Sequence, residues 1–136
     1  MPFVSTILCV DDDEDDLLFI KETIRSRGYS FTIAEAKNGW EAINFLQKAQ
    51  DDDVLPCLII MDLNMPRMDG KQTINKIRES EKLAPIPIAV FTTSSNHTDR
   101  QYFENLGVRF MTKPFDYKIF TSQIVDLLAF CADLGS

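Results

Sequence analysis

A short apolar run constrains the fold of this chain more than any other feature. Residues 58–61 (Leu-Ile-Ile-Met) are all apolar, and Pro56 and Pro66 lie on either side of them. The run is too short for a helix that buries itself, and it is typical of a strand that is buried on both faces, as in a parallel sheet covered by helices. The run ends at Asp62. We therefore expect this carboxylate at the carboxyl end of a central strand, where open α/β sheets form their ligand crevices.

The rest of the sequence alternates between short apolar runs and segments with helical spacing. The pattern predicts further strands over Thr6–Val10, Phe31–Ala36, Ile88–Phe91 and Val108–Met111. It predicts helices over 14–27, around 40–49, from 73 to near 81, over 98–106 and over 116–132. Five strand–helix units predict an α/β fold of the flavodoxin-like, doubly wound (βα)5 type, with a parallel five-stranded sheet in the order 2-1-3-4-5. The 136 residues are expected to form a single domain, 1–136.

The composition excludes several classes of function. Asp and Glu total 21 against 14 Lys and Arg, and the net charge of −7 argues against direct nucleic-acid binding, which needs basic patches. No apolar run approaches the ~20 residues of a membrane span, and the amino terminus has no signal-peptide pattern. Cys9, Cys57 and Cys131 form no C-x-x-C pair. These features predict a reduced, cytoplasmic protein without disulfides.

Carboxylates follow two strands that the predicted order makes neighbours. Asp11 and Asp12 come directly after the first strand, and Asp62 ends the third. Crowded carboxylates repel one another unless a cation lies between them or a pKa rises. With oxygen ligands alone, Mg²⁺ is the natural occupant, and Mn²⁺ is a second one. A carboxylate beside such an ion can attack phosphorus and form an acyl phosphate.

The last two strands end in groups that suit a phosphoryl group. Thr92 and Thr93 offer hydroxyl donors after the fourth strand, and Lys113 offers a compact cation after the fifth. The whole set resembles the motifs of response-regulator receiver domains of two-component signalling, of the stand-alone, chemotaxis-receiver-like type. The motifs are Asp11-Asp12, Asp62-Leu63-Asn64-Met65-Pro66, Met68-Asp69-Gly70, Thr92 and Lys113-Pro114-Phe115, in order along nearly the whole chain.

The resemblance implies a role for each matching acidic residue. It implies that Asp62 is the phosphoacceptor and that Asp11 and Asp12 hold the Mg²⁺, Asp12 more directly. The Asn64 backbone carbonyl is implied as a further metal ligand. Asp13, Asp15 and Asp16 are then expected to be solvated charges at the start of the first helix.

The resemblance also implies a conformational switch. Thr92 matches the hydroxyl that moves onto the phosphoryl group, although the adjacent Thr93 could take its place. Lys113 matches the lysine that pairs with the phosphoryl group, and Phe110 lies where the family has an aromatic switch residue. The segment from Gly107 to Lys113 is one residue shorter than the usual pattern.

The implied function is that of a single-domain response regulator rather than an enzyme that turns over a substrate. Its partners would be a sensor histidine kinase or a phosphotransfer protein, and a downstream protein target. Four residues follow the last predicted helix, so no output domain is expected. Apolar residues cover about half of that helix. This wide face indicates either deep burial against the sheet or a partner surface, including a homodimer through the fourth helix, fifth strand and fifth helix.

Two other readings of the acidic stretch remain open. Asp11, Asp13, Asp15 and Glu22 fall at positions 1, 3, 5 and 12 of an EF-hand calcium loop, but Asp16 stands where the loop needs glycine. A haloacid-dehalogenase-type phosphotransferase would use Asp11 and Asp13 as a pair of acids, although the chain is short for that fold. An FMN-binding flavodoxin is disfavoured because an acidic loop after the first strand would repel a phosphate.

Overall fold

One parallel sheet organises the structure. The computed structural model describes residues 5–28, 30–63, 70–93 and 97–132. The sheet has five parallel strands in the order β2-β1-β3-β4-β5, which is the predicted order. The strands are β1 (Thr6–Val10), β2 (Thr32–Ala36), β3 (Leu58–Asp62), β4 (Ile88–Thr92) and β5 (Arg109–Thr112). The fold is therefore the doubly wound α/β fold that the sequence predicts.

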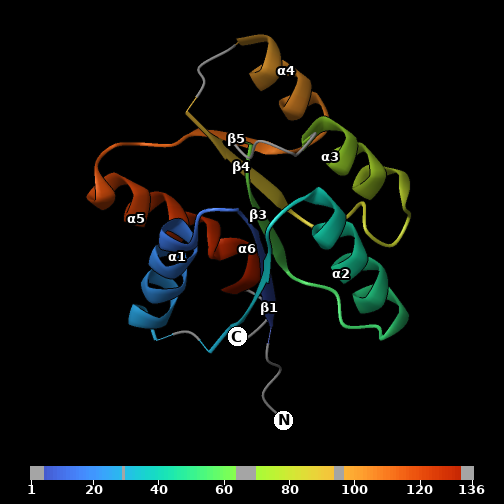
Figure 1. The fold of residues 1–136 in the computed structure, drawn as a ribbon, viewed down its shortest axis with the longest axis horizontal. Helices are drawn as coiled ribbons and strands as arrows, with labels where there is room; N and C mark the ends of the chain where they lie inside the picture. Colours follow the sequence, from blue (N-terminus) through green and yellow to red (C-terminus); the bar gives the residue numbers. More distant parts are fainter. Residues whose placement is uncertain (1–4, 29, 64–69, 94–96, 133–136) are drawn as a thin grey trace.

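Helices cover both faces of this sheet (Figure 1). One face carries α1 (Glu14–Ser26), α5 (Tyr117–Leu127) and the short α6 (Ala129–Ala132). The other face carries α2 (Gly39–Asp51), α3 (Gly70–Glu79) and α4 (His97–Asn105). Because both faces are covered, the central strands are apolar at nearly every position instead of alternating with polar residues.

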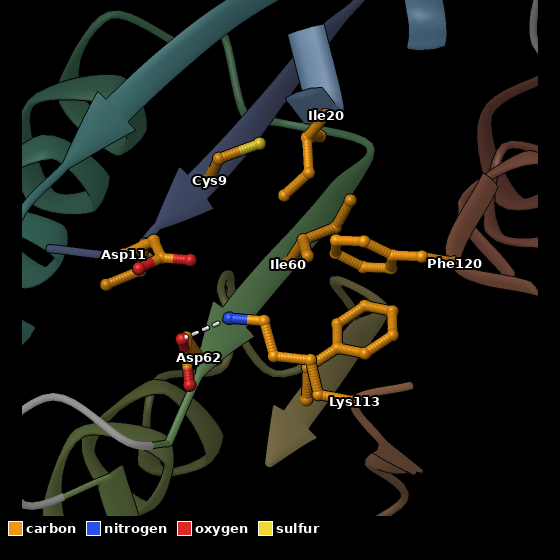
Figure 2. A pocket seen from close by; sticks show the side chains of 9 residues that line it. Cys9, Asp11, Ile20, Ile60, Asp62, Lys113 and Phe120 are labelled. Atoms are coloured by element: carbon orange, nitrogen blue, oxygen red, sulfur yellow. Dashed lines mark hydrogen bonds and ion pairs between the residues drawn. The ribbon is translucent and has the colours of Figure 1, made fainter. Parts of the chain in front are cut away.

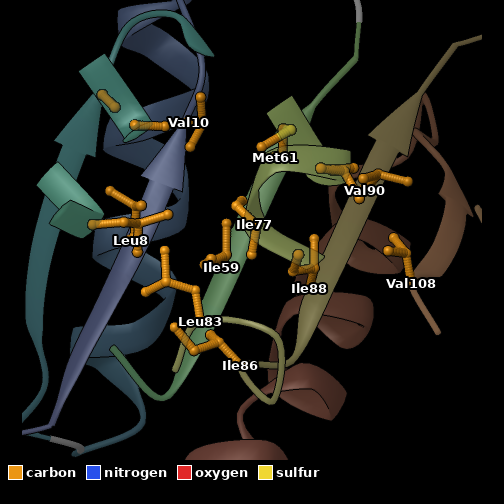
Figure 3. Close-up of a cluster of buried hydrophobic side chains, with 14 of the residues drawn as sticks. Leu8, Val10, Ile59, Met61, Ile77, Leu83, Ile86, Ile88, Val90 and Val108 are labelled. Atoms are coloured by element: carbon orange, nitrogen blue, oxygen red, sulfur yellow. The ribbon is translucent and has the colours of Figure 1, made fainter. Parts of the chain in front are cut away.

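Successive side chains of a strand enter two separate cores. Ile59 and Met61 of β3 belong to the core on the side of α2, α3 and α4. Figure 3 shows both side chains within this cluster. Leu58 and Ile60, between them along the strand, pack against α1 and α5 instead. This two-residue alternation decides which face each strand-end side chain reaches.

The carboxy-terminal helix is shorter than the sequence predicts. A single helix is expected over 116–132, but Asp116 is the N-cap of α5 and the helix ends at Leu127. The Leu128 amide donates to both the Ile124 and Val125 carbonyl oxygens, a tightened turn that separates α5 from α6. The deep-burial reading of this segment accounts for the buried side chains Phe120, Ile124, Leu127, Leu128 and Cys131.

The prediction of a chain without disulfides is wrong. Cys57 and Cys131 form a disulfide, with their Cα atoms 5.4 Å apart and a sequence separation of 74 residues. Cys57 directly precedes β3, and Cys131 lies in α6. The bond therefore joins the start of the central strand to the carboxy-terminal helix, at the opposite end of β3 from Asp62. Cys9 is a buried free thiol.

No helix in the described part of the chain is long and apolar enough to cross a membrane.

Candidate functional site

Two buried carboxylates meet at the carboxyl edge of the sheet. Asp11 follows the last residue of β1, and Asp62 is the last residue of β3. The two strands are neighbours in the sheet, with Val10 opposite Met61. Asp11 and Asp62 are only 4% and 7% exposed, although both are acids. Asp11 lies two residues after Cys9, and Asp62 two residues after Ile60. Since Cys9 and Ile60 belong to the core beneath α1 and α5, both carboxylates face these helices.

Lys113 completes this site from the end of β5. Its backbone amide donates to the Thr92 carbonyl oxygen, which fixes the start of the segment after β5. Its Nζ lies 3.0 Å from Asp62 Oδ2, and Figure 2 shows the side chain reaching across to that carboxylate. Lys113 Nζ also pairs with Asp16 Oδ2 in the first turn of α1. The lysine is therefore held between the central strand and the first helix.

Apolar side chains close the site from below. The pocket beneath Asp11, Asp62 and Lys113 is lined by Cys9, Ile20, Ile60, Phe91 and Phe120 (Figure 2). This lining keeps water away from the inner side of the charged groups. Charge–charge interactions in the site are consequently stronger than they would be at the surface.

Burial changes the pKa of Asp11. Desolvation raises the pKa of Asp11 from 3.8 to about 7, and the negative charges of Asp62 and Asp16 act in the same direction. A hydrogen bond from the Asp13 backbone amide and the charge of Lys113 act to lower it, without compensating for the burial. Asp11 is thus a carboxyl group that takes up a proton near neutral pH unless a cation offsets its charge.

At Lys113 the charged partners have a larger effect on the pKa than burial has. Burial acts to lower the pKa of its ammonium group, but hydrogen bonds to Asp16 and Asp62 and the charge of Asp11 outweigh the burial and raise the pKa. Lys113 is therefore a permanent cation of the site at physiological pH. Cys9, below it, is a buried thiol whose pKa is raised to about 12, mainly by desolvation, so it stays protonated.

The donor set fits a divalent cation. One carboxylate oxygen each of Asp11, Asp16 and Asp62 lies within 4.8 Å of the others. Hard cations such as Mg²⁺ and Mn²⁺ prefer such oxygen ligands and usually take one or two carboxylates with several waters. Asp11 and Asp62 are the members of this group that the sequence predicts.

Asp16 belongs to the candidate site although the sequence predicts a solvated charge at this position. Its side chain is only 17% exposed and contacts Lys113. A sequence signal was present, because Asp16 precedes the buried residues Ile20 and Ile24 by one and two helical turns. Residues four apart share a helix face, so Asp16 turns toward the sheet.

The other predicted acidic residues lie elsewhere. Asp12 is exposed and lies with Asp13, Glu14 and Asp15 along an open acidic surface, outside the group of three carboxylates. Its role as a metal ligand stays a prediction. Asn64 lies outside the described residues, so its predicted carbonyl contact also stays a prediction.

The side chain of Asp13 caps α1. Its Oδ1 accepts hydrogen bonds from the amides of Asp15 and Asp16. Such a cap satisfies two of the free amides at a helix start. Both the calcium-loop and the dehalogenase alternatives require Asp13 as a ligand or acid, and its position as a helix cap disfavours them.

The predicted switch residues share the other face of the sheet. Thr92 is buried at the end of β4, whereas Thr93 is exposed, which favours Thr92 of the two adjacent hydroxyls. Phe110 pairs in register with Val90, two residues before Thr92, so the alternation places Phe110 and Thr92 on the same face. The Phe110 ring is buried, stacks on Phe103 of α4 and lies 5.0 Å from the Arg100 guanidinium carbon.

The fold and this site define a class of protein: a doubly wound α/β domain with buried carboxylates and a lysine at the switch point of its sheet. The sequence model of the response regulator receiver domain matches residues 7–125. The chain belongs to this family.

Individual relatives agree with the family. The chain is 32% identical to a chemotaxis protein CheY homolog of Campylobacter jejuni, over 90% of this chain and 91% of that protein. The phosphorylated cyanobacterial phytochrome response regulator RcpA has the same fold, with a TM-score of 0.85, 24% identity and coverage of 98% of both chains. The Mn²⁺-bound form of Rcp1, from Synechocystis, has a TM-score of 0.81 at 28% identity and coverage of 93% of both chains.

The matched region also occurs within much larger proteins. The chain is 34% identical to histidine kinase P4 of Formosa agariphila, but it spans only 8% of that protein's length.

Proposed function

We propose that this chain is a single-domain response regulator that accepts a phosphoryl group on Asp62 from a sensor histidine kinase or a phosphotransfer protein. The observation that carries the proposal is the buried Asp62 carboxylate, which is paired with Lys113 beside Asp11 at the edge of the sheet. Matches to a CheY homolog and to a histidine kinase support the pairing with a kinase.

The proposed reaction transfers the phosphoryl group between two side chains. An Asp62 oxygen attacks the phosphorus of a partner phosphohistidine, and an acyl phosphate bond forms as the phosphorus–nitrogen bond breaks. The imidazole ring, which carries a proton on its other nitrogen, leaves with the electron pair of that bond as neutral imidazole. Lys113 Nζ, already at Asp62 Oδ2, offsets charge on the transferring group.

A divalent cation, Mg²⁺ or in its place Mn²⁺, would supply further charge compensation. Asp11 and Asp62 would hold it, with Asp12 and the Asn64 backbone carbonyl as the additional ligands that the family resemblance implies. The Mn²⁺-bound form of Rcp1 supports a cation of this type in this family. Such a receiver catalyses its own phosphorylation and dephosphorylation, but it does not turn over a substrate as an enzyme does.

The signal would leave through a change in conformation. Thr92 would move toward the phosphoryl group and Phe110 would follow, because the two residues share one face of the sheet. The readout would be contact with a downstream protein, or a homodimer through α4, β5 and α5. On α5, Tyr117 and Ile119 are exposed apolar side chains that fit such a contact.

The proposed setting is the cytoplasm, without a membrane or nucleic-acid partner, but the Cys57–Cys131 disulfide removes the absence of disulfides as support for it. The net charge of −7 supports the absence of a nucleic-acid partner.

The decisive experiment measures intact mass after incubation with acetyl phosphate and Mg²⁺. We expect one added phosphoryl group in the parent and none with EDTA. Asp62→Asn should gain none, whereas Asp126→Asn, which removes an exposed carboxylate on α5, should behave as the parent.

Two results would contradict this proposal. An adduct that persists in Asp62→Asn would place the acceptor elsewhere. A parent that gains no adduct and forms no beryllofluoride complex would not be a phosphoacceptor; a stable beryllofluoride complex alone would instead indicate a short-lived phosphoryl group.

A further inference from the structure

Lys113 has two carboxylate partners that belong to different parts of the fold. Asp62 ends the central strand, whereas Asp16 lies in the first turn of α1. Within the described residues, these are the two carboxylates that form an ion pair with the Lys113 ammonium group. We propose that Asp16 is a positioning residue: it holds Lys113 at the site when a divalent cation takes over Asp62.

The need for a second partner follows from charge. Asp62 Oδ2 lies 3.0 Å from Lys113 Nζ, and the cation of the proposed function would bind the same carboxylate. Two positive groups within a few ångströms repel each other strongly in a site that is shielded from water. Lys113 must therefore weaken its contact with Asp62 when the cation binds.

Lys113 cannot simply move into water. Its side chain is only 17% exposed, and apolar residues line the pocket beneath it. Asp16 offers a carboxylate that is equally buried and already in contact with Nζ. A small shift of the ammonium group toward Asp16 preserves one ion pair while it frees Asp62.

The backbone fixes Asp16 in this place. Asp13 caps α1 through the amides of Asp15 and Asp16, and Ile20 and Ile24 anchor the same helix face in the core. The Asp16 carboxylate is therefore held beside Lys113 and cannot move far when the cation binds. The inference rests on the proposed function for its cation, but it concerns a residue to which that function assigns no role.

Mn²⁺ affinity, measured by calorimetry or electron paramagnetic resonance without any phosphodonor, tests the inference. The variants are Asp16→Asn, Lys113→Met, the double variant, and Asp15→Asn as a matched control. Asp15 is also in the first turn of α1 but is exposed. Thermal unfolding checks that each variant is folded.

We expect Asp16→Asn to weaken Mn²⁺ binding about tenfold, because Lys113 then has only Asp62 to pair with. Lys113→Met should strengthen binding, because the competing cation is gone. In the Lys113→Met background, Asp16→Asn should cost no more than Asp15→Asn, about twofold. A general effect of charge or of fold stability would not depend on Lys113 in this way.

Each other outcome has a definite meaning. Equal losses in the two backgrounds would make Asp16 a direct cation ligand and overturn the positioning role. A loss no larger than that of Asp15→Asn in the parent background would reduce Asp16 to a distant charge, and would also overturn it. If the parent binds no Mn²⁺, the proposed cation site fails together with this inference, whereas Mn²⁺ binding without coupling to Lys113 refutes the inference alone.

Discussion

Asp11 is a buried carboxyl group whose ionised form is disfavoured in the folded chain. Its pKa of about 7 in the folded chain, against an ordinary 3.8, means that the folded state holds a proton that the unfolded state has released between these pH values. By linkage, the contribution of Asp11 to the stability of the cation-free protein should fall as pH rises from about 4 to about 7, and level off above. Above this window the ionised carboxylate is destabilising, and below it the carboxyl is neutral in both states.

The change that tests this is Asp11→Asn, with unfolding followed by urea in EDTA at several pH values. At pH 8 the variant should be more stable than the parent, by up to about 4 kcal/mol, which is what a rise of the Asp11 pKa from 3.8 to about 7 corresponds to, and near pH 4 the difference should vanish. A variant that is less stable than the parent at pH 8 would show that Asp11 is stabilised as an anion.

A separate prediction concerns Thr92. It tests whether this residue links the phosphoryl group to Phe110, not whether Asp62 accepts the group. If it links the phosphoryl group to Phe110, Thr92→Ala should still be phosphorylated on Asp62 but should lose the change in the Phe110 ring signals that phosphorylation causes in the parent. The exposed Thr93→Ala is the matched control and should retain this change. NMR of selectively labelled phenylalanine measures it. The same loss in both variants would argue that neither hydroxyl is specific.

Among the elements, α3 and α4 are joined by a row of polar contacts. Lys71 Nζ lies 3.2 Å from Asp99 Oδ1 and 5.0 Å from the centre of the Tyr102 ring. One turn later, Asn75 Nδ2 donates to the Tyr102 hydroxyl at 2.8 Å. Phe103, whose ring contacts that of Tyr102, stacks on Phe110, so the row lies on the face of the sheet that carries the predicted switch residues.

Arg78 ends this row and connects three segments. Its Nε donates to the Leu106 carbonyl oxygen at 2.9 Å, and Nη1 donates to the carbonyl oxygens of Ala84 and Ile86. Nη2 lies 3.4 Å from the Gly107 carbonyl oxygen. The guanidinium group thus ties the end of α3 to the loop before β4 and to the end of α4. Burial lowers its pKa without removing its charge.

Because one side chain serves four carbonyl groups, Arg78→Met should lower the free energy of unfolding by about 2–3 kcal/mol. Lys76→Met removes an exposed cation of the same helix, which lies over the Trp40 ring, and should change it by less than ~1 kcal/mol. Chemical denaturation compares the two. Similar small losses would mean that water replaces Arg78 at these carbonyls.

Strand ends were predictable at the level of elements because their chemistry is local. A polar residue follows or ends each of these apolar runs: Asp11, Asp62 and Lys113. The order of the strands in this fold class was then enough to predict that the three residues lie together. Asp16 was missed because an acidic residue at a helix start has an adequate local explanation as a solvated charge. The ion pair with Lys113, which follows β5, gives Asp16 a second role. That contact joins residues far apart in the sequence, so no local pattern reveals it.

At the scale of the whole molecule, the disulfide is the feature that sequence spacing could not reveal. Cys57 and Cys131 are 74 residues apart and match no motif, and only the packing of α6 against the start of β3 brings them together. The bond closes a loop that contains the last three strands. The end of β3 that carries Asp62, the proposed phosphoacceptor, lies at the opposite end of the strand from Cys57.

This arrangement separates stability from the proposed chemistry. Closing a loop of this length restricts the unfolded chain, so the oxidised protein should be more stable than the reduced one by about 2–4 kcal/mol. Denaturation with and without dithiothreitol measures the difference, and Cys57→Ser in oxidising buffer should match the reduced parent.

The rate at which acetyl phosphate modifies Asp62 should differ by less than about twofold between the two redox states, because the folded site does not contact the disulfide. A large change in that rate would mean that α6 transmits its position along β3 to the carboxylates. The covalent tie would then affect the proposed chemistry as well as the stability of the fold.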